Sequence, residues 1–209
     1  PPGTAIVTNI DNEQEILNIT IPSDALVLSR HYNLGKLSTF CVASRCTVTA
    51  QRNLTVGQII LNLKYVATNV LDMIADTYGP SNVLVTSGFR YDRVGNQSFH
   101  GIGQAVDLQF RDIRPDEYYQ RAREIAALIP YDGFLLEYKN EGTRLPWLHI
   151  QFRKEGNRGF RRTYFNHRQV AQEFVNLQPD IERQLTASAI IQRLAGRSPE
   201  ELAAFRLSS

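Results

Sequence analysis

Hydrophobic residues recur at steps of three and four over residues 55–78, the spacing that places them on one face of an α-helix. Thr55 is a suitable N-cap, and Gln58 stands three residues later, as in a capping box. Gly79 and Pro80 predict the end of the helix. The repeating apolar positions are Ile59, Ile60, Leu63, Val66, Ala67, Val70, Leu71 and Ile74.

Shorter apolar or alternating segments predict β-strands over residues 83–87, 105–110, 133–138 and 147–152. The loop between the last two contains Gly142 and Pro146, so we expect these strands to form a hairpin. A second helix is expected over residues 115–128, ended by Pro130. Residues 1–30 have an extended pattern, and residues 31–53 are expected to be irregular.

The order of these elements predicts an α+β fold, in which helices pack on one face of a small antiparallel sheet. We expect an extended segment or linker over residues 1–26, one domain over residues 27–160 and a helical extension over residues 161–209. The extension is predicted because Val170, Phe174 and Leu177 recur at helical spacing, and because Ser198-Pro199-Glu200-Glu201 resembles a helix start.

Composition restricts the classes of partner. Of 209 residues, 43% are hydrophobic and 21% are charged, as in ordinary globular proteins. A net charge of +2 is too small to indicate a nucleic-acid partner. The sequence contains no apolar stretch of membrane-spanning length and no signal-peptide pattern at its start. Since there is no initiator Met, we expect a processed chain or a piece of a longer polypeptide.

Two cysteines, Cys41 and Cys46, are five positions apart. A local disulfide, a metal-binding pair and two reduced thiols are all compatible with this spacing. We favour reduced structural thiols, because free cysteines are commonly buried and two cysteines do not make a disulfide-scaffold composition.

Three potential metal ligands are associated with the predicted strands. His100 precedes residues 105–110, Asp107 lies within them, and His149 lies within residues 147–152. Strand alternation puts Asp107 and His149 on the more polar face of their strands. Ligands that arrive from separate elements can hold a zinc ion. Taken one at a time, each of these residues is more typical of a structural polar role than of a metal ligand.

Taken together, three motifs resemble one family of zinc peptidases. They are Ser87-Gly88-Phe89-Arg90, then Ser98-Phe99-His100-Gly101-Ile102-Gly103-Gln104-Ala105-Val106-Asp107, then Trp147-Leu148-His149. In this order they are similar to the motifs of D-alanyl-D-alanine carboxypeptidases and L-alanyl-D-glutamate endopeptidases. Residues 28–37 also resemble the opening segment of that family, so the resemblance covers roughly residues 27–153.

The resemblance implies that His100, Asp107 and His149 bind one Zn²⁺ at the sheet, and that residues 27–160 form the peptidase domain. Arg90 would hold a carbonyl or carboxylate of the substrate and stabilise the developing oxyanion. From its residue type alone, Arg90 is also compatible with a surface salt bridge.

Further site residues follow from the same motifs. The resemblance implies that Ser98 contacts the substrate or fixes its loop, that Trp147 contributes to substrate binding, and that Gly103 allows close approach of the backbone. We interpret His31, in the opening segment, as structural.

The general base is the point at which this sequence departs from the family. Zinc activates a water molecule, and a carboxylate or His then takes the proton. Many relatives have a Glu three residues before the last zinc ligand, where this chain has Pro146. We expect Glu137 to replace it, because pairing across the hairpin would put Glu137 opposite Trp147 or His149. Glu141, another residue or no base at all are the alternatives.

The predicted function is zinc-dependent hydrolysis of a peptide bond in peptidoglycan stem peptides. We expect a bacteriophage protein, either an endolysin or a wall hydrolase of the virion tail or baseplate, which acts from the virion or from the host cytoplasm. Tail or baseplate proteins are then possible partners, and neither nucleic acid nor a membrane is expected. The alternative, favoured by Pro146, is a catalytically impaired structural or wall-binding module of a phage tail assembly that keeps the fold.

Overall fold

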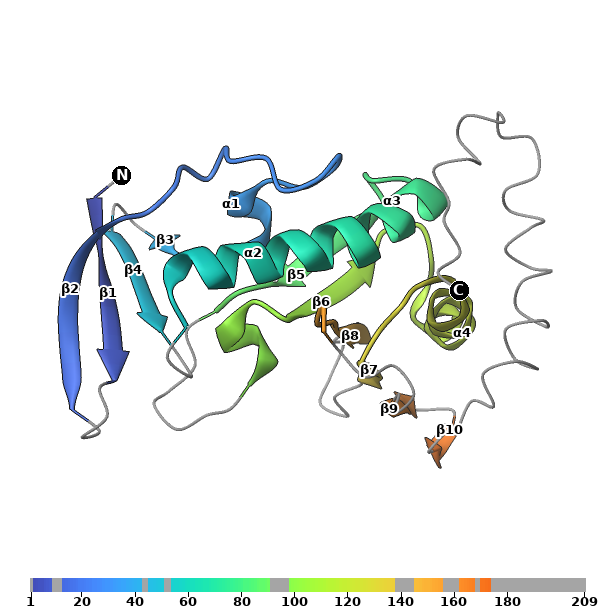
Figure 1. The fold of residues 1–209 in the computed structure, drawn as a ribbon. Coiled ribbons are helices and arrows are strands. Elements are labelled where there is room, and N and C mark those ends of the chain that lie inside the picture. The colour runs from blue at the N-terminus through green and yellow to red at the C-terminus, as the bar shows by residue number, and fades with distance from the viewer. Residues whose placement is uncertain are drawn as a thin grey trace.

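The computed structural model describes residues 2–8, 13–42, 45–50, 54–90, 98–137, 145–155, 162–167 and 170–173. They form an α+β fold with two sheets, as the sequence predicts at this level (Figure 1). The larger sheet has six strands in the order β10-β9-β7-β8-β6-β5. The strands are β5 (Val83–Ser87), β6 (Ala105–Phe110), β7 (Gly133–Glu137), β8 (Trp147–Gln151), β9 (Arg162–His167) and β10 (Val170–Glu173).

The predicted strands β5, β6, β7 and β8 are all present, and β7 and β8 form the expected antiparallel pair. The pairs β5–β6 and β6–β8 are antiparallel as well. Only β7 and β9 run parallel within this sheet as described. The four predicted strands therefore lie side by side, although residues far apart in the sequence form them.

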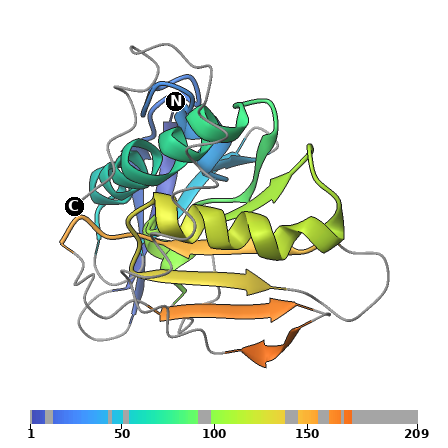
Figure 2. The same ribbon diagram turned by 90° about the vertical axis from the view of Figure 1, so that its right-hand side faces the viewer.

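Helices cover one face of the larger sheet. Figure 2 shows α4 (Tyr118–Leu128) in front of the sheet and nearly along its strands, with α2 (Val56–Val66), η1 (Ala67–Leu71) and α3 (Asp72–Tyr78) above it. The strand residues that face these helices are apolar and buried, and they form one core with the helices. They are Val106, Leu108, Phe110, Phe134, Leu136, Leu148 and Ile150. The polar residues that alternate with them are left on the opposite face.

The long helix begins and ends as its sequence predicts. Thr55 accepts a hydrogen bond from the backbone N–H of Gln58, whose side chain accepts one from the backbone N–H of Thr55. Gly79 follows α3 with a φ of 91°, a conformation that favours glycine. Between these ends, η1 is a π-helical turn, which links α2 and α3. The second predicted helix is a 3₁₀ turn, η3 (Pro115–Glu117), followed by α4.

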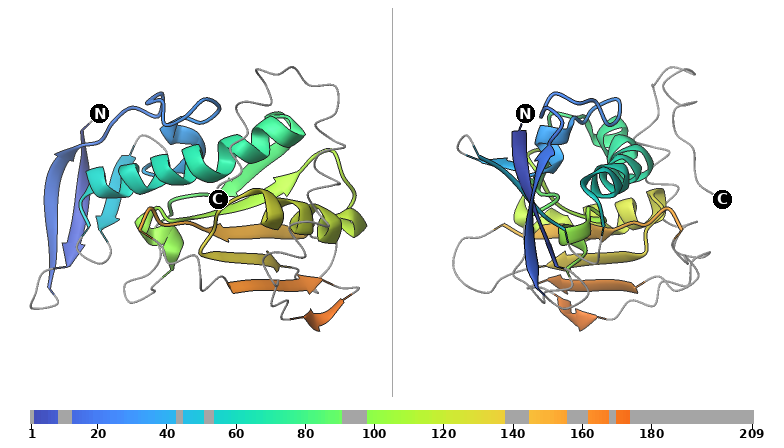
Figure 3. Two further views of the ribbon diagram at one scale, coloured as in Figure 1. Left: turned by 45° about the vertical axis from the view of Figure 1, so that its right-hand side comes forward. Right: turned by 60° about the vertical axis from the view of Figure 1, so that its left-hand side comes forward.

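A second sheet forms near the N-terminus. Its strands β1 (Pro2–Thr8), β2 (Gln14–Thr20), β3 (Cys41–Val42) and β4 (Arg45–Ala50) are ordered β2-β1-β4-β3 (Figure 3). The irregular structure predicted for residues 31–53 is therefore wrong for β3 and β4. It is also wrong for the short helix α1 (Leu34–Leu37). Since β1 pairs with β4, the sheet joins strands from both sides of the expected boundary at residue 26.

The prediction of reduced thiols is wrong as well. Cys41 is disulfide-bonded, and Cys46 is the only other cysteine of the sequence. The two residues are directly opposed in the antiparallel pair β3–β4. Residues opposed in this way have Cβ atoms close to the separation that a disulfide requires. Strand pairing, which the spacing of five did not indicate, explains the bond.

The helical prediction also fails over residues 162–167 and 170–173, which form β9 and β10. β9 adds to the edge of β7, whose backbone groups would otherwise lack partners on that side. Thr163, Tyr164 and Phe165 are residue types that favour strands. The rest of the predicted extension, residues 174–209, lies outside the described part of the chain. Within the described part, no helix combines the length and the apolar character needed to cross a bilayer.

Candidate metal centre

The polar face of the larger sheet carries the candidate ligands in one row. Asp107 on β6 is directly opposite His149 on β8. Asp107 is also opposite Ser87 on β5, and His149 is opposite Leu135 on β7. Leu108 and Leu148, the next residues on β6 and β8, point into the core and are fully buried. The face that strand alternation predicts for Asp107 and His149 is therefore the one observed.

His100 reaches this row from η2 (Phe99–Ile102), the short 3₁₀ helix before β6. Its imidazole is 1% exposed, and its Nδ1 lies 2.8 Å from the backbone carbonyl oxygen of Gly88. A carbonyl oxygen only accepts, so Nδ1 carries a proton. Nε2 is the ring nitrogen directed toward Asp107 and His149.

These three side chains present a compact set of ligand atoms. Nε2 of His100 lies 3.2 Å from Oδ1 of Asp107 and 3.2 Å from Nδ1 of His149. Nδ1 of His149 lies 2.8 Å from the same Asp107 oxygen. Ligand atoms of a tetrahedral zinc ion lie about 3.3 to 3.6 Å apart, given metal–ligand bonds of about 2.0 to 2.2 Å. The triangle fits zinc if Asp107 and His149 separate slightly. Nitrogen and carboxylate donors also suit other divalent metals, so the group could hold a metal ion whose identity the geometry does not determine.

The electrostatics of the cluster favour a charged carboxylate. Burial by itself raises the pKa of the Asp107 carboxyl. Hydrogen bonds and charge interactions with His100 and His149 act in the opposite direction, and together they hold this pKa well below its usual range. A metal ligand must be deprotonated, so Asp107 is in the form that a cation needs.

Two motif glycines allow this arrangement. Gly103 follows η2 with a φ of 74°, and a Cβ there would lie 2.7 Å from the carbonyl oxygen of Ile59 on α2. A Cβ at Gly88 would overlap the carbonyl oxygen of Leu37, which accepts a hydrogen bond from the N–H of Phe89. The close approach predicted for Gly103 is therefore confirmed. Gly88 has an equivalent role that we had not expected.

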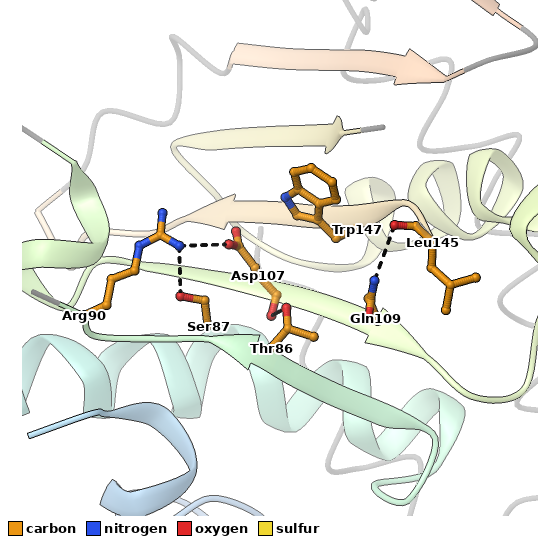
Figure 4. Close-up of a pocket in the computed structure, with 7 residues that line it drawn as sticks. All are labelled: Thr86, Ser87, Arg90, Asp107, Gln109, Leu145 and Trp147. Carbon is orange, nitrogen blue, oxygen red and sulfur yellow. Dashed lines mark hydrogen bonds and ion pairs between the residues drawn. The ribbon is translucent and has the colours of Figure 1, made fainter. Parts of the chain in front are cut away.

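Arg90 lies beside the cluster, at the end of the same motif. Its Nη1 is 3.9 Å from Oδ2 of Asp107 and donates to the Ser87 hydroxyl at 3.3 Å. The side chain is 45% exposed. Figure 4 shows Arg90 and Trp147 on either side of Asp107. The guanidinium can therefore approach a ligand that contacts a metal held by Asp107.

A pocket of about 410 Å³ opens on this face of the sheet. Asp107, Arg90 and Trp147 line it, so the expected substrate-binding positions of Arg90 and Trp147 lie next to the metal ligands. Ser98 does not line it. The Ser98 hydroxyl accepts a hydrogen bond from the backbone N–H of His100, which fixes the loop that carries the ligand. The remaining lining residues are Thr86, Ser87, Gln109 and Leu145.

The register of the hairpin locates the expected base. Glu137 on β7 is opposite Trp147 and therefore shares the face of His149, its diagonal neighbour on β8. Pro146 is buried, and its carbonyl oxygen accepts a hydrogen bond from Gln109. Glu141 lies outside the described residues. Among the described residues, Glu137 forms no hydrogen bond or ion pair with His100, Asp107 or His149, so its role as the base stays a prediction.

His31 belongs to a different cluster. Its Nε2 lies 2.7 Å from Asp76 on α3, and its backbone N–H donates to Asp72 at 3.3 Å. Asp72 also accepts from the Ser29 hydroxyl and from the N–H of Arg30. These contacts fasten the opening segment to α3, in keeping with the structural interpretation of His31.

Sequence reasoning missed some neighbours of the ligands. The contact of His100 with the Gly88 carbonyl involves a backbone atom, so no residue type in the sequence indicates it. Only the fold brings the two groups together. Gln151 lies 3.0 Å from Nε2 of His149. Its position two residues after His149, on the same face of the strand, could have predicted this contact.

Comparison with known proteins adds no assignment, since no family model, curated protein or solved structure matches this chain.

The metal site predicts a defined stoichiometry. We expect the purified protein to bind one equivalent of zinc and His149→Ala to lose it, because two remaining ligands hold the ion far less tightly. Elemental analysis after dialysis measures the content. His31→Ala, which alters a histidine outside the cluster, should keep its zinc. Stoichiometric zinc retained by His149→Ala would contradict this ligand set.

The close packing at Gly88 predicts a coupled defect. In Gly88→Ala the new methyl group displaces the backbone that holds His100, so we expect destabilisation of about 2 kcal/mol and weaker zinc binding. Gly57→Ala is the matched control, since its methyl group meets only Thr55 Oγ1, at 3.9 Å. That change should leave zinc binding intact and stabilise α2 by up to about 1 kcal/mol. Urea unfolding and zinc titration measure both effects, and equal behaviour of the two variants would refute the packing argument.

Proposed function

We propose that this chain is a zinc metallopeptidase that hydrolyses a peptide bond in peptidoglycan stem peptides. The observation that carries the proposal is the convergence of His100, Asp107 and His149 within one cluster that Arg90 adjoins. The peptide substrate comes from the resemblance of the three sequence motifs to D-alanyl-D-alanine carboxypeptidases and L-alanyl-D-glutamate endopeptidases. The geometry supports the metal site and a substrate-binding role for the neighbouring Arg90.

His100, Asp107 and His149 would hold the zinc ion through Nε2, Oδ1 and Nδ1. A zinc ion bound there supplies a Lewis acid and activates water at neutral pH. Catalytic zinc sites with three protein ligands keep one position for the reaction. Asp107 lines the pocket together with Arg90 and Trp147, so a ligand bound in the pocket would lie next to a residue that would hold the ion.

Arg90 would bind and polarise the substrate. Its guanidinium has planar, paired donors that match a carboxylate or a developing oxyanion. It contacts Ser87 and Asp107, and its side chain is 45% exposed, so a ligand in the pocket can reach it. The stem peptides of peptidoglycan carry both amide carbonyls and free carboxylates, which are the groups that such a donor recognises.

Glu137 would take the proton of the attacking water and return it to the leaving amine. It is on the correct face of the sheet and one strand away from His149. A carboxylate from the neighbouring strand can serve the function that relatives give to a Glu at the position of Pro146. A scaffold with no such reaction to perform has little physical reason to keep the three ligands and Arg90 together.

The alternative is a structural or wall-binding module of a phage tail assembly. Pro146 favours it, because proline supplies no acid or base at the position where relatives have a carboxylate. This module would bind zinc and sacculi without cleaving them. Binding and cleavage therefore need to be measured on the same preparation.

The enzymatic proposal predicts cleavage that depends on the metal. Zinc-loaded protein should release peptide fragments from purified sacculi, and prior treatment with a chelator should abolish release until zinc is restored. Synthetic stem peptides with either an L-Ala-D-Glu or a D-Ala-D-Ala bond identify the bond by mass spectrometry. Binding of sacculi by zinc-loaded protein without any cleavage would support the alternative module instead.

The proposed base predicts a selective loss of turnover. We expect Glu137→Gln to lower kcat about 100-fold or more, because the amide cannot accept the proton. Its zinc content should match the unmodified protein, which separates loss of the base from loss of the metal. Glu155→Gln, at an exposed position after β8, is the matched control and should keep full turnover. Equal rates for both variants would exclude Glu137 as the base.

A further inference from the structure

Gln151 contacts His149 on the side of the imidazole that faces away from the metal cluster. Nδ1 of His149 lies 2.8 Å from Asp107, whereas Nε2 lies 3.0 Å from the side-chain amide of Gln151. The two residues are two positions apart on β8 and share its polar face. The ring is thus held between a carboxylate and an amide, with one nitrogen for each.

We propose that Gln151 is a positioning residue, which sets the tautomer of His149 and through it the metal affinity of the cluster. The inference rests on the metal site of the proposed function but not on its peptidoglycan substrate. It concerns the ring nitrogen that does not bind the metal, and the partner of such a nitrogen tunes a ligating histidine.

The amide is suited to both states of the ring. Without metal, the ionised Asp107 only accepts, so the neutral ring carries its proton on Nδ1. Nε2 of His149 then accepts a hydrogen bond from the amide NH₂ of Gln151. With a metal on Nδ1, the ring must carry its proton on Nε2, which needs an acceptor. Half a rotation of the amide exchanges its nitrogen for its oxygen at nearly the same place.

The imidazole of His149 would lose one proton and gain another in this exchange, so its charge would not change. One proton leaves Nδ1 for solvent as the metal binds, and one is gained at Nε2, so the imidazole is neutral before and after. An apolar side chain at position 151 would leave the Nε2–H of the metal-bound form without a partner. The cost of that missing hydrogen bond would oppose metal binding.

Gly133 provides the space for this amide. It is directly opposite Gln151 in the pairing of β7 with β8, and a Cβ at Gly133 would lie 2.6 Å from Oε1 of Gln151. The absence of a side chain at Gly133 therefore lets the amide lie flat over β7 while it contacts His149. A methyl group at Gly133 would push the far end of Gln151 away without changing any donor or acceptor.

The first test is zinc affinity, measured by competition with a chromophoric chelator. We expect Gln151→Leu to weaken zinc binding by about 10- to 100-fold. Gln151→Glu keeps an acceptor for Nε2–H, so at pH 8 it should bind zinc at least as tightly as the unmodified protein. The same two substitutions at Gln120, an exposed residue of α4, are the matched controls and should leave affinity unchanged. Unchanged affinity in Gln151→Leu would overturn the proposal.

The second measurement locates the proton on the His149 ring nitrogens by ¹H–¹⁵N NMR spectroscopy. We expect the ring proton on Nδ1 without zinc and on Nε2 with zinc. The Nε2–H signal of the zinc-bound form should exchange slowly in the unmodified protein and in Gln151→Glu, and should be lost to fast exchange in Gln151→Leu. Weaker zinc binding with an unaltered Nε2–H signal would show that Gln151 acts through the general structure and not through His149.

Gly133→Ala keeps the proposal testable if Gln151→Leu fails to fold. It should weaken zinc binding in the same direction while Gln151 itself is intact, and affinity equal to that of the unmodified protein would count against the proposal. The outcomes separate the two proposals. An unmodified protein that binds no zinc defeats the metal site and the proposed function together. Zinc binding that is insensitive to Gln151 defeats this inference alone, and neither result requires any measurement of hydrolysis.

Discussion

The antiparallel register of β6 and β8 is the constraint on which the metal centre depends. It sets Asp107 directly opposite His149, with Leu108 and Leu148 buried behind them. A slip of one residue would move one ligand into the core and bring an aliphatic side chain to the surface. The burial of those leucines therefore stabilises the fold and also fixes which polar atoms meet. Two of the three ligands follow from this single choice of register.

The third ligand depends on backbone packing and not on strand alternation. His100 is placed by η2, which α2 approaches so closely that Gly103 has no room for a side chain. The Asn62 side chain on α2 donates to the Ile102 carbonyl oxygen at 2.9 Å and ties the two elements together. Phe89 pairs with residues 37–39 and holds the strand end whose Gly88 carbonyl orients the ring. The motif glycines thus act through space, by letting three backbone segments meet.

Much of this arrangement was predictable from the sequence because it follows from local rules. Helical periodicity and the capping pair Thr55 and Gln58 gave the long helix, and alternation gave the faces of β6 and β8. The errors concern contacts between distant segments. The strand β4 is defined by its pairing with β1, and β9 by its addition to β7. Strand-favouring residue types such as Thr163, Tyr164 and Phe165 do not by themselves identify these partners. The disulfide of Cys41 follows from the same missing information, since it depends on which strands are paired.

The hairpin also determines where the proposed catalytic carboxylate lies. Pro146 stands immediately before β8, where it has no N–H to donate, and its carbonyl oxygen is used by Gln109. A carboxylate that serves the metal must then arrive from another strand. The β7–β8 register brings Glu137 opposite Trp147, diagonal to His149, whereas Leu135 occupies the place directly opposite the ligand. An acidic residue at position 135 would lie directly opposite His149, but one at position 137 is displaced by two residues along β7 and lies opposite Trp147. Pro146, at the position where the peptidases that the motifs resemble have a Glu, is therefore compatible with the proposed base across the hairpin.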